Sequence, residues 1–250
     1  MKLLPLLPVW IAVVACAGCY IAPTYELFDD WWLRTPVGDG EDPAVARECI
    51  AGRNHMRRVI GCRSLGIIAE KRRRDGDDTG ASRIARELEM HFLGEGQERV
   101  RQAIAGICLR DAGRGDWRTT AFLTERLREG PPGPVAAVAW TLASRDMGGR
   151  YEDVASAYGT ARAMGDAELC HELLGAMWLL GDPRALGLMC RALDEMRRAE
   201  RGDPACEALW PAKMHKVLRS WYLSALDSRI DRLSAWTGVA RPDEAVTRRE

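Results

Sequence analysis

The chain has 250 residues, of which 47% are hydrophobic and 29% are charged, the balance of a folded protein with one sizeable core. Its 36 basic residues equal its 36 acidic residues, so no net field attracts it to nucleic acid, and we expect no nucleic-acid partner. Ala, Leu, Arg and Glu are plentiful, β-branched residues are sparse and no strand alternation is evident, which predicts an all-α fold.

Residues 1–15 have the pattern of an export signal peptide. Lys2 precedes an apolar stretch that runs from Leu3 to Ala15, which is the charge-then-hydrophobe order of such signals. The stretch ends in Val13-Val14-Ala15-Cys16. This ending resembles the lipobox of bacterial lipoproteins, and the resemblance implies cleavage before Cys16 and attachment of diacylglycerol, with fatty acids such as palmitate, to its thiol.

Three alternatives to this lipid site stay open. Cys19 follows Ala17-Gly18, the commoner small pair, and is a second candidate for the lipid. An uncleaved membrane anchor is another, because apolar residues continue to Ala22 and about 20 are needed to span a bilayer. The third is a conventional signal without lipid. Lys2 before the segment and acidic residues after it predict a body that faces the periplasm or the exterior from a bacterial cell-envelope membrane.

The rest of the chain divides into a tether, a helical domain and a tail. Residues 16–42 contain scattered Pro and Gly and are predicted to be a tether. Residues 43–240 form a series of amphipathic segments with short Gly, Asp and Pro breaks, typical of helices. Residues 241–250 are predicted to be a frayed tail. The longest expected helices cover about 43–52, 55–74 and 80–93, and a further long one ends near Trp236.

Three Asp-Pro pairs predict helix starts, because the carboxylate caps free backbone N–H groups and proline fits the first helical position. They are Asp42-Pro43, Asp182-Pro183 and Asp203-Pro204. Gly181 can take the left-handed conformation that ends a helix, so with Asp182 it predicts a very short turn between antiparallel helices.

Apolar stripes recur along the helical domain. Val100, Val135 and Leu169 begin three of them, at spacings of 35 and 34 residues. Another stripe is formed by Trp117, Ala121, Leu123 and Leu127. A period near 34 is typical of an α-solenoid of stacked antiparallel helical hairpins, in which each hairpin covers its apolar face with its neighbours.

Two repeat families are candidates for this solenoid. Residues 166–193, with the Gly181-Asp182-Pro183 turn, resemble HEAT-like repeats, which implies a binding surface on the concave side. Residues 149–161 instead resemble the second helix of a tetratricopeptide or Sel1-like repeat, although their partner helix lacks the pattern of that family. An unrelated helical bundle is the third alternative.

Six cysteines remain after Cys16 and Cys19, and an exported chain can form disulfides. Cys170 and Cys190 are the candidate disulfide, because they can meet across one predicted hairpin. The alternative is that each is a small hydrophobic residue of an apolar stripe.

Asp75, Asp77 and Thr79 form a weak calcium-site candidate, because the segment up to Gly80 resembles the first half of an EF-hand loop. The second half departs from that loop, since Arg86 stands where the bidentate glutamate is required. The alternative is a solvated turn in which Asp78 or Thr79 caps the next helix. We therefore expect no metal and no cofactor.

No catalytic motif appears, because the four histidines are scattered and neither a phosphate-binding loop nor a nucleophile elbow is present, so we expect no enzyme. The predicted function is that of a membrane-anchored exported lipoprotein whose helical repeats bind a protein or peptide. The alternatives are an accessory or lyase-like subunit of an envelope enzyme, with a pocket in the solenoid groove, and a purely structural envelope component.

Overall fold

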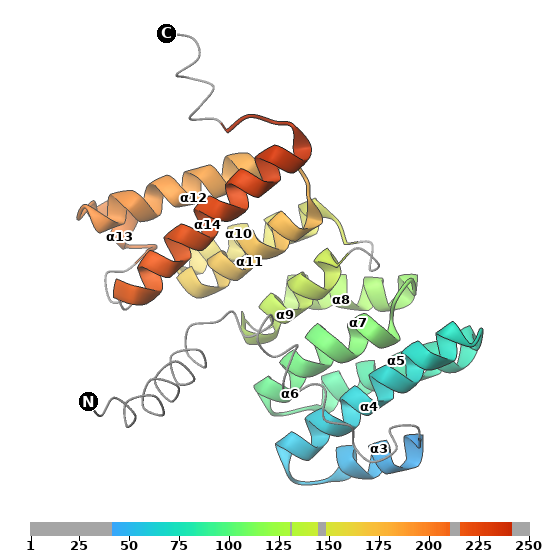
Figure 1. The fold of residues 1–250 in the computed structure, drawn as a ribbon. Coiled ribbons are helices and arrows are strands. Elements are labelled where there is room, and N and C mark those ends of the chain that lie inside the picture. The colour runs from blue at the N-terminus through green and yellow to red at the C-terminus, as the bar shows by residue number, and fades with distance from the viewer. Residues whose placement is uncertain (1–41, 131, 145–148, 211–215, 242–250) are drawn as a thin grey trace, which may run out of the picture. The chain divides into compact units, whose positions relative to one another are not determined.

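The computed structural model describes residues 42–130, 132–144, 149–210 and 216–241, which all belong to one compact unit (Figure 1). Every regular element in these residues is a helix, so the all-α prediction is confirmed. The predicted signal peptide, both candidate lipid sites at Cys16 and Cys19, and all of the tether except its last residue lie outside the described residues.

The first three described helices agree with the predicted ones to within two residues. They are α3 (Pro43–Ala51), α4 (His55–Arg74) and α5 (Asp78–Gly94). A continuous helical segment follows, made of α6 (Glu98–Ala103), a π-helical turn (Ile104–Cys108) and α7 (Leu109–Ala112). The remaining helices are α8 (Trp117–Glu129), α9 (Pro132–Ala143), α10 (Tyr151–Met164), α11 (Ala167–Leu180), α12 (Ala185–Glu200), α13 (Pro204–Glu207) and α14 (Lys216–Thr237).

Two of the three Asp-Pro pairs start helices as predicted. The side chains of Asp42 and Asp203 each accept a hydrogen bond from the backbone N–H two residues later, at 2.8 and 3.0 Å. In the third pair Asp182 makes the same contact, accepting from Arg184 N at 2.9 Å, but α12 begins two residues later than predicted, at Ala185, and Pro183 lies in the preceding turn. The reason is a tight turn in which the carbonyl of Asp182 accepts from Ala185 N. Gly181 has φ of 69°, as the predicted helix end requires.

The helices pack mainly against their neighbours and form two rows. One row runs from α4 through α6 and α7 to α9, α11 and α14, and the other runs from α5 through α8 to α10, with α12 after it (Figure 1). Val100, Val135 and Leu169 lie in the first turns of α6, α9 and α11 and are 0%, 6% and 6% exposed. The repeated stripe therefore occupies equivalent places in one row, while the solenoid and its repeat type stay predictions.

Four polar contacts between helices of different hairpins have nearly the same chain separation, while others span from 25 to 40 residues. Three of them join a helix to the next helix in its row or to that helix's cap, and the fourth joins α12 to α14 of the other row. Across 30 to 33 residues, they connect Arg86 to Asp116, Trp140 to Glu172, Arg162 to Glu195, and Arg197 to Asp227. These four separations are close to the 34- and 35-residue spacings of the apolar stripes.

Aromatic residues and one arginine join α9, α11 and α14. The guanidinium of Arg229 lies 5.6 Å from the ring centre of Trp140 and 5.8 Å from that of Trp178. Gly175 makes room for this contact, because a Cβ there would lie 2.5 Å from Cζ2 of Trp140. One turn earlier on α11, the ring of His171 stacks on Tyr222 with centres 4.0 Å apart.

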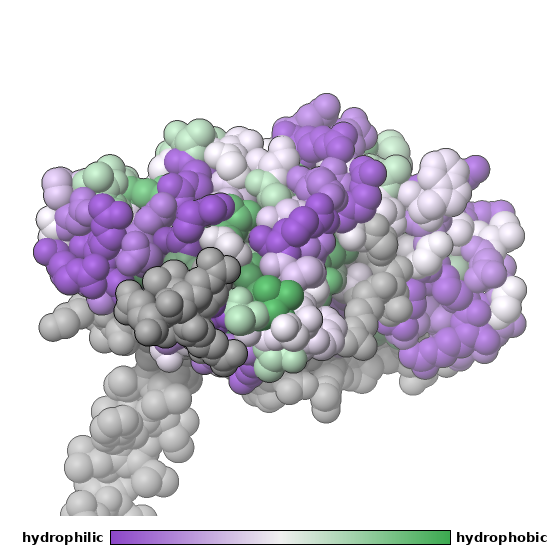
Figure 2. Space-filling model, turned by 90° about the horizontal axis from the view of Figure 1, so that it is seen from above, coloured by the Kyte–Doolittle hydropathy of each residue, from purple (hydrophilic) through white to green (hydrophobic). Residues whose placement is uncertain are grey.

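Figure 2 views the unit from the top of Figure 1, where α12 and α14 lie, and shows a face that is largely hydrophilic, with hydrophobic residues in small separate areas. Within the parts of the chain that the structure describes, no helix combines the length and the apolar character that crossing a bilayer requires.

Candidate functional site

Helix α8 is fixed at its start by Asp116. One carboxylate oxygen accepts from Arg118 N at 2.9 Å, and the other accepts from Arg86 on α5 at 2.6 Å. Thr119, Leu123 and Leu127 are 0%, 0% and 3% exposed, and their spacing of four residues places them on one side of the helix. The opposite side of α8 is consequently turned to solvent.

The outward side of α8 forms a shallow cavity of about 410 Å³ together with the start of α10. Its lining on α8 runs from Trp117 to Glu129 at helical spacing, and α10 contributes Arg150 and Asp153. We call this cavity the α8 trough. Its volume lies within the range of about 300 to 1,000 Å³ that is usual for ligand sites.

One end of the trough is aromatic and its middle is lined by small residues. Trp117 is 73% exposed, which is unusual for so large an apolar side chain, and the guanidinium of Arg118 lies 5.5 Å from its ring centre. Ala121 and Thr124 line the middle and project little from the helix. A ligand that lies along α8 can therefore reach the helix surface beside an accessible indole.

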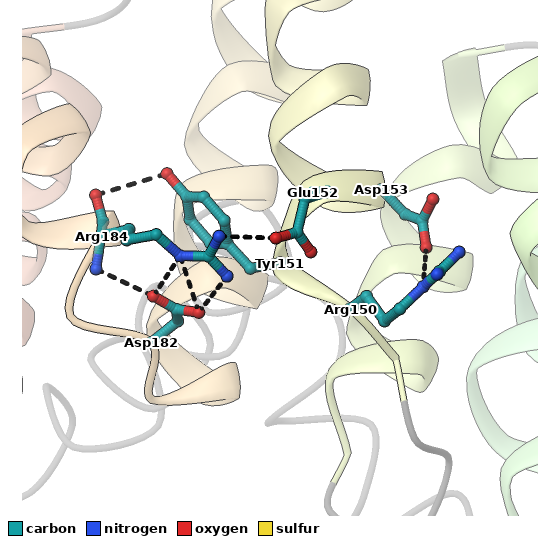
Figure 3. Close-up of polar contacts among 6 residues, drawn as sticks. All are labelled: Arg150, Tyr151, Glu152, Asp153, Asp182 and Arg184. Carbon is teal, nitrogen blue, oxygen red and sulfur yellow. Dashed lines mark hydrogen bonds and ion pairs between the residues drawn. The ribbon is translucent and has the colours of Figure 1, made fainter.

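The other end of the trough is built around the carboxylate of Asp153, which is 7% exposed. It accepts from Nη2 of Arg128 at 2.6 Å and from Nε of Arg150 at 3.2 Å, the second contact being drawn in Figure 3. The two arginine side chains are themselves 58% and 69% exposed. A buried carboxylate thus positions two guanidinium groups whose other N–H groups can meet a ligand.

A second polar network ties the start of α10 to the turn before α12 (Figure 3). Arg184 donates to Glu152 at 2.5 Å and to Asp182 at 2.6 Å. These hydrogen bonds hold the pKa of both carboxyl groups below their ordinary values. Burial raises the pKa of Tyr151, whose hydroxyl donates to the carbonyl of Arg184 at 3.3 Å. The first turn of α10 is therefore bound both to α8, through Arg128 and Asp153, and to the turn before α12, through Arg184 and Glu152.

The sequence prediction for Trp117 and Ala121 was wrong in direction. Both were placed on one stripe with Leu123 and Leu127, yet they lie on the exposed side of α8 and the two leucines on the buried side. The sequence contained the information that separates Trp117 from the two leucines. Thr119 stands four residues before Leu123 and completes a buried stripe to which position 117 does not belong. The arginine pair on Asp153 carried no comparable signal in the sequence.

The calcium-site candidates lie where α4 ends and α5 begins. Asp75 caps the end of α4, Asp77 caps the start of α5 by accepting from Gly80 N at 2.8 Å, and Thr79 is inside α5. The alternative that Asp78 or Thr79 caps the helix is wrong, because Asp77 holds that position. Among the described residues no three or more His, Cys, Asp and Glu side chains gather as metal ligands would, and the calcium hypothesis stays a prediction.

The two cysteines of the candidate disulfide lie on the predicted pair of helices. Cys170 is buried on α11, and Cys190 is half-buried on α12. Burial raises the pKa of the Cys170 thiol to about 12, so as a thiol it stays protonated and unreactive at neutral pH. The disulfide stays a prediction, which alkylation of the unfolded, unreduced chain tests directly.

Comparison with known protein families, characterised proteins and solved structures finds no match for this chain. The lipobox and the HEAT-like or tetratricopeptide-like repeats therefore stay hypotheses, and the α8 trough is the candidate binding site of the described residues.

Proposed function

We propose that this chain is an exported, lipid-anchored scaffold of stacked helical hairpins that binds a protein or peptide segment in the α8 trough. The observation that carries the proposal is the trough itself, which combines an indole that is 73% exposed with two arginines held on one buried carboxylate. Exposed aromatic residues and arginines are the side chains that most often contribute strongly to protein interfaces.

The form of the trough favours a peptide over a compact small molecule. Its lining follows one face of α8 from Trp117 to Glu129, and it is a partly open hollow on the surface instead of an enclosed cavity. The ionisable side chains at its arginine end are engaged in ion pairs, as Arg128 and Arg150 are with Asp153. Such an arrangement suits recognition, and we assign no catalytic role to it.

Crosslinking tests the binding function. A photoreactive amino acid replaces Ala121, which is exposed in the trough, and as a matched control Thr160, which is exposed on α10 outside it. Irradiation of the full chain in its native membranes is expected to give defined protein adducts from position 121 and not from position 160. Adducts that are equal at both positions, or none at position 121, would contradict the proposal.

Lipid attachment is tested separately, because it rests on the sequence of residues 1–19 alone. Labelling with radioactive palmitate is expected to mark the chain and to be abolished by Cys16→Ser but not by Cys19→Ser. Loss only on Cys19→Ser would move the lipid to the alternative cysteine. Labelling of neither the parent chain nor the variants would remove the anchor from the proposal and leave the trough unaffected.

A further inference from the structure

We infer that the occupant of the α8 trough is an extended peptide that places a carboxylate on Arg128 and Arg150 and an aromatic side chain on Trp117. This inference rests on the proposed binding function and adds the chemistry of the ligand.

The arginine end favours an anion. Nη2 of Arg128 and Nε of Arg150 bind opposite oxygens of the Asp153 carboxylate, so the two guanidinium groups are fixed beside each other. Each guanidinium has five N–H donors, and a second carboxylate can accept from several of them in the charge-assisted geometry that arginine provides. Since both arginines are more than half exposed, an incoming carboxylate can reach them.

The acidic residues of the trough do not cancel this preference. Arg126 pairs with Glu125 at 2.5 Å and with Glu129 at 3.5 Å, so both glutamates already have a cation beside them. The lining has two arginines, at positions 128 and 150, and three carboxylates, at positions 125, 129 and 153, so an excess of positive charge exists only at the arginine end, where two guanidinium groups share the single carboxylate of Asp153. At that end a carboxylate of the ligand is therefore favoured over an ammonium group.

The aromatic end and the spacing define the rest of the ligand. The indole of Trp117 is 73% exposed, and aromatic rings pair with it in stacked or edge-to-face geometry. Trp117 and Arg128 lie eleven positions apart on α8, which corresponds to about 16 Å along the helix axis. An extended chain covers that distance in about five residues. We therefore expect an aromatic residue and a carboxylate about five positions apart.

Defined peptides test the inference against the full chain, solubilised in detergent. The lead peptide carries a fluorescent label, a phenylalanine, four alanines and an aspartate, and ends in an amide. Three analogues replace the aspartate with asparagine, with lysine, or with alanine followed by a free C-terminal carboxylate. The last analogue distinguishes a chain terminus from an acidic side chain as the source of the anion. Fluorescence anisotropy gives each dissociation constant.

The aspartate peptide is expected to bind about tenfold more tightly than the asparagine peptide, and the lysine peptide most weakly. Arg150→Gln is expected to remove the preference for aspartate over asparagine, and Trp117→Ala to weaken both peptides by the same factor. Met164→Ala and Arg201→Gln, which change exposed residues at the C-terminal ends of α10 and α12, outside the trough, are expected to retain parent affinities. Circular dichroism checks that all four variants remain helical.

Three results would overturn the inference. Equal affinity for the aspartate and asparagine peptides, or a preference for lysine, would exclude carboxylate recognition. Retention of the aspartate preference in the folded Arg150→Gln chain would exclude the arginine pair. If none of the peptides binds while position 121 still crosslinks to a protein, this ligand chemistry is wrong and the proposed binding function stands; if crosslinking also fails, both are wrong.

Discussion

The guanidinium of Arg184 lies 4.5 Å from the ring centre of Tyr151, although the two residues belong to different hairpins. Tyr151 begins α10, and Arg184 closes the turn that precedes α12. The same guanidinium binds Glu152, so stacking and ion pairing act together on the first turn of α10. That turn also carries Asp153, and this contact therefore supports the arginine end of the α8 trough from the side opposite α8.

Arg184→Ala is expected to lower Tm by about 2 °C or less, because its ion pairs are solvent-exposed and screened by salt. Arg184→Lys retains the charge and loses the planar stacking on Tyr151, so its Tm is expected to lie between those of the parent and the alanine variant. Differential scanning calorimetry at low and high salt measures both. Arg191→Ala on the exposed side of α12 is the control, and a larger loss there would contradict the role given to Arg184.

Gly175→Ala is expected to destabilise the chain by about 1 to 3 kcal/mol, because the new methyl group overpacks a filled site. It would lie 2.5 Å from Cζ2 of Trp140 and 2.9 Å from Nη1 of Arg229. Gly159→Ala is the matched control in a helix, since nothing lies within 4 Å of its added Cβ. That substitution is expected to be neutral or to stabilise by up to about 1 kcal/mol. Urea unfolding measures both, and equal effects would refute the packing argument.

The positions that the sequence predicted well are those governed by local chemistry. Asp42 and Asp203 cap helices because the carboxylate and its proline act within a single turn. The burial of Val100, Val135 and Leu169, each in the first turn of its helix, followed from the period of the apolar stripes. The outward direction of Trp117 was also contained in the local spacing of Thr119, Leu123 and Leu127, whereas the close packing at Gly175 depends on neighbours far along the chain. The convergence of Arg128 and Arg150 on Asp153 likewise required the relative positions of two helices, which no local pattern encodes.

Asp116→Ala is expected to lower the free energy of unfolding by about 1 to 2 kcal/mol, because it removes both the cap of α8 and the ion pair with Arg86. Asp116→Asn keeps an oxygen for the cap and loses the charge, so we expect a smaller loss. Urea unfolding of the two variants separates the contribution of the helix cap to the free energy of unfolding from that of the ion pair. If asparagine proves as destabilising as alanine, the ion pair and not the cap is the main contribution of Asp116.

His171 makes stability depend on pH, because burial, assisted by the nearby charge of Arg229, lowers its pKa from the ordinary 6.5 to about 3. Below pH 6.5 the unfolded chain binds a proton at this ring and the folded chain does not, so stability is complete above pH 6.5 and is lost as the pH falls towards 3. Between about pH 7.5 and 5.5, the free energy of unfolding is expected to fall by about 1.4 kcal/mol on account of this group.

His171→Phe isolates that contribution, since phenylalanine keeps a ring against Tyr222 and cannot take up a proton. Carboxylates such as Glu87 and Asp182 have pKa values lowered by arginine hydrogen bonds and stay ionised over this pH range. Urea unfolding at the two pH values is therefore expected to show a drop for the parent that exceeds the drop for His171→Phe by about 1.4 kcal/mol. Equal drops would mean that His171 is protonated in the folded chain at mildly acidic pH. The position of His171 opposes this, because an imidazolium buried between α11 and α14 would lie beside the positive charge of Arg229.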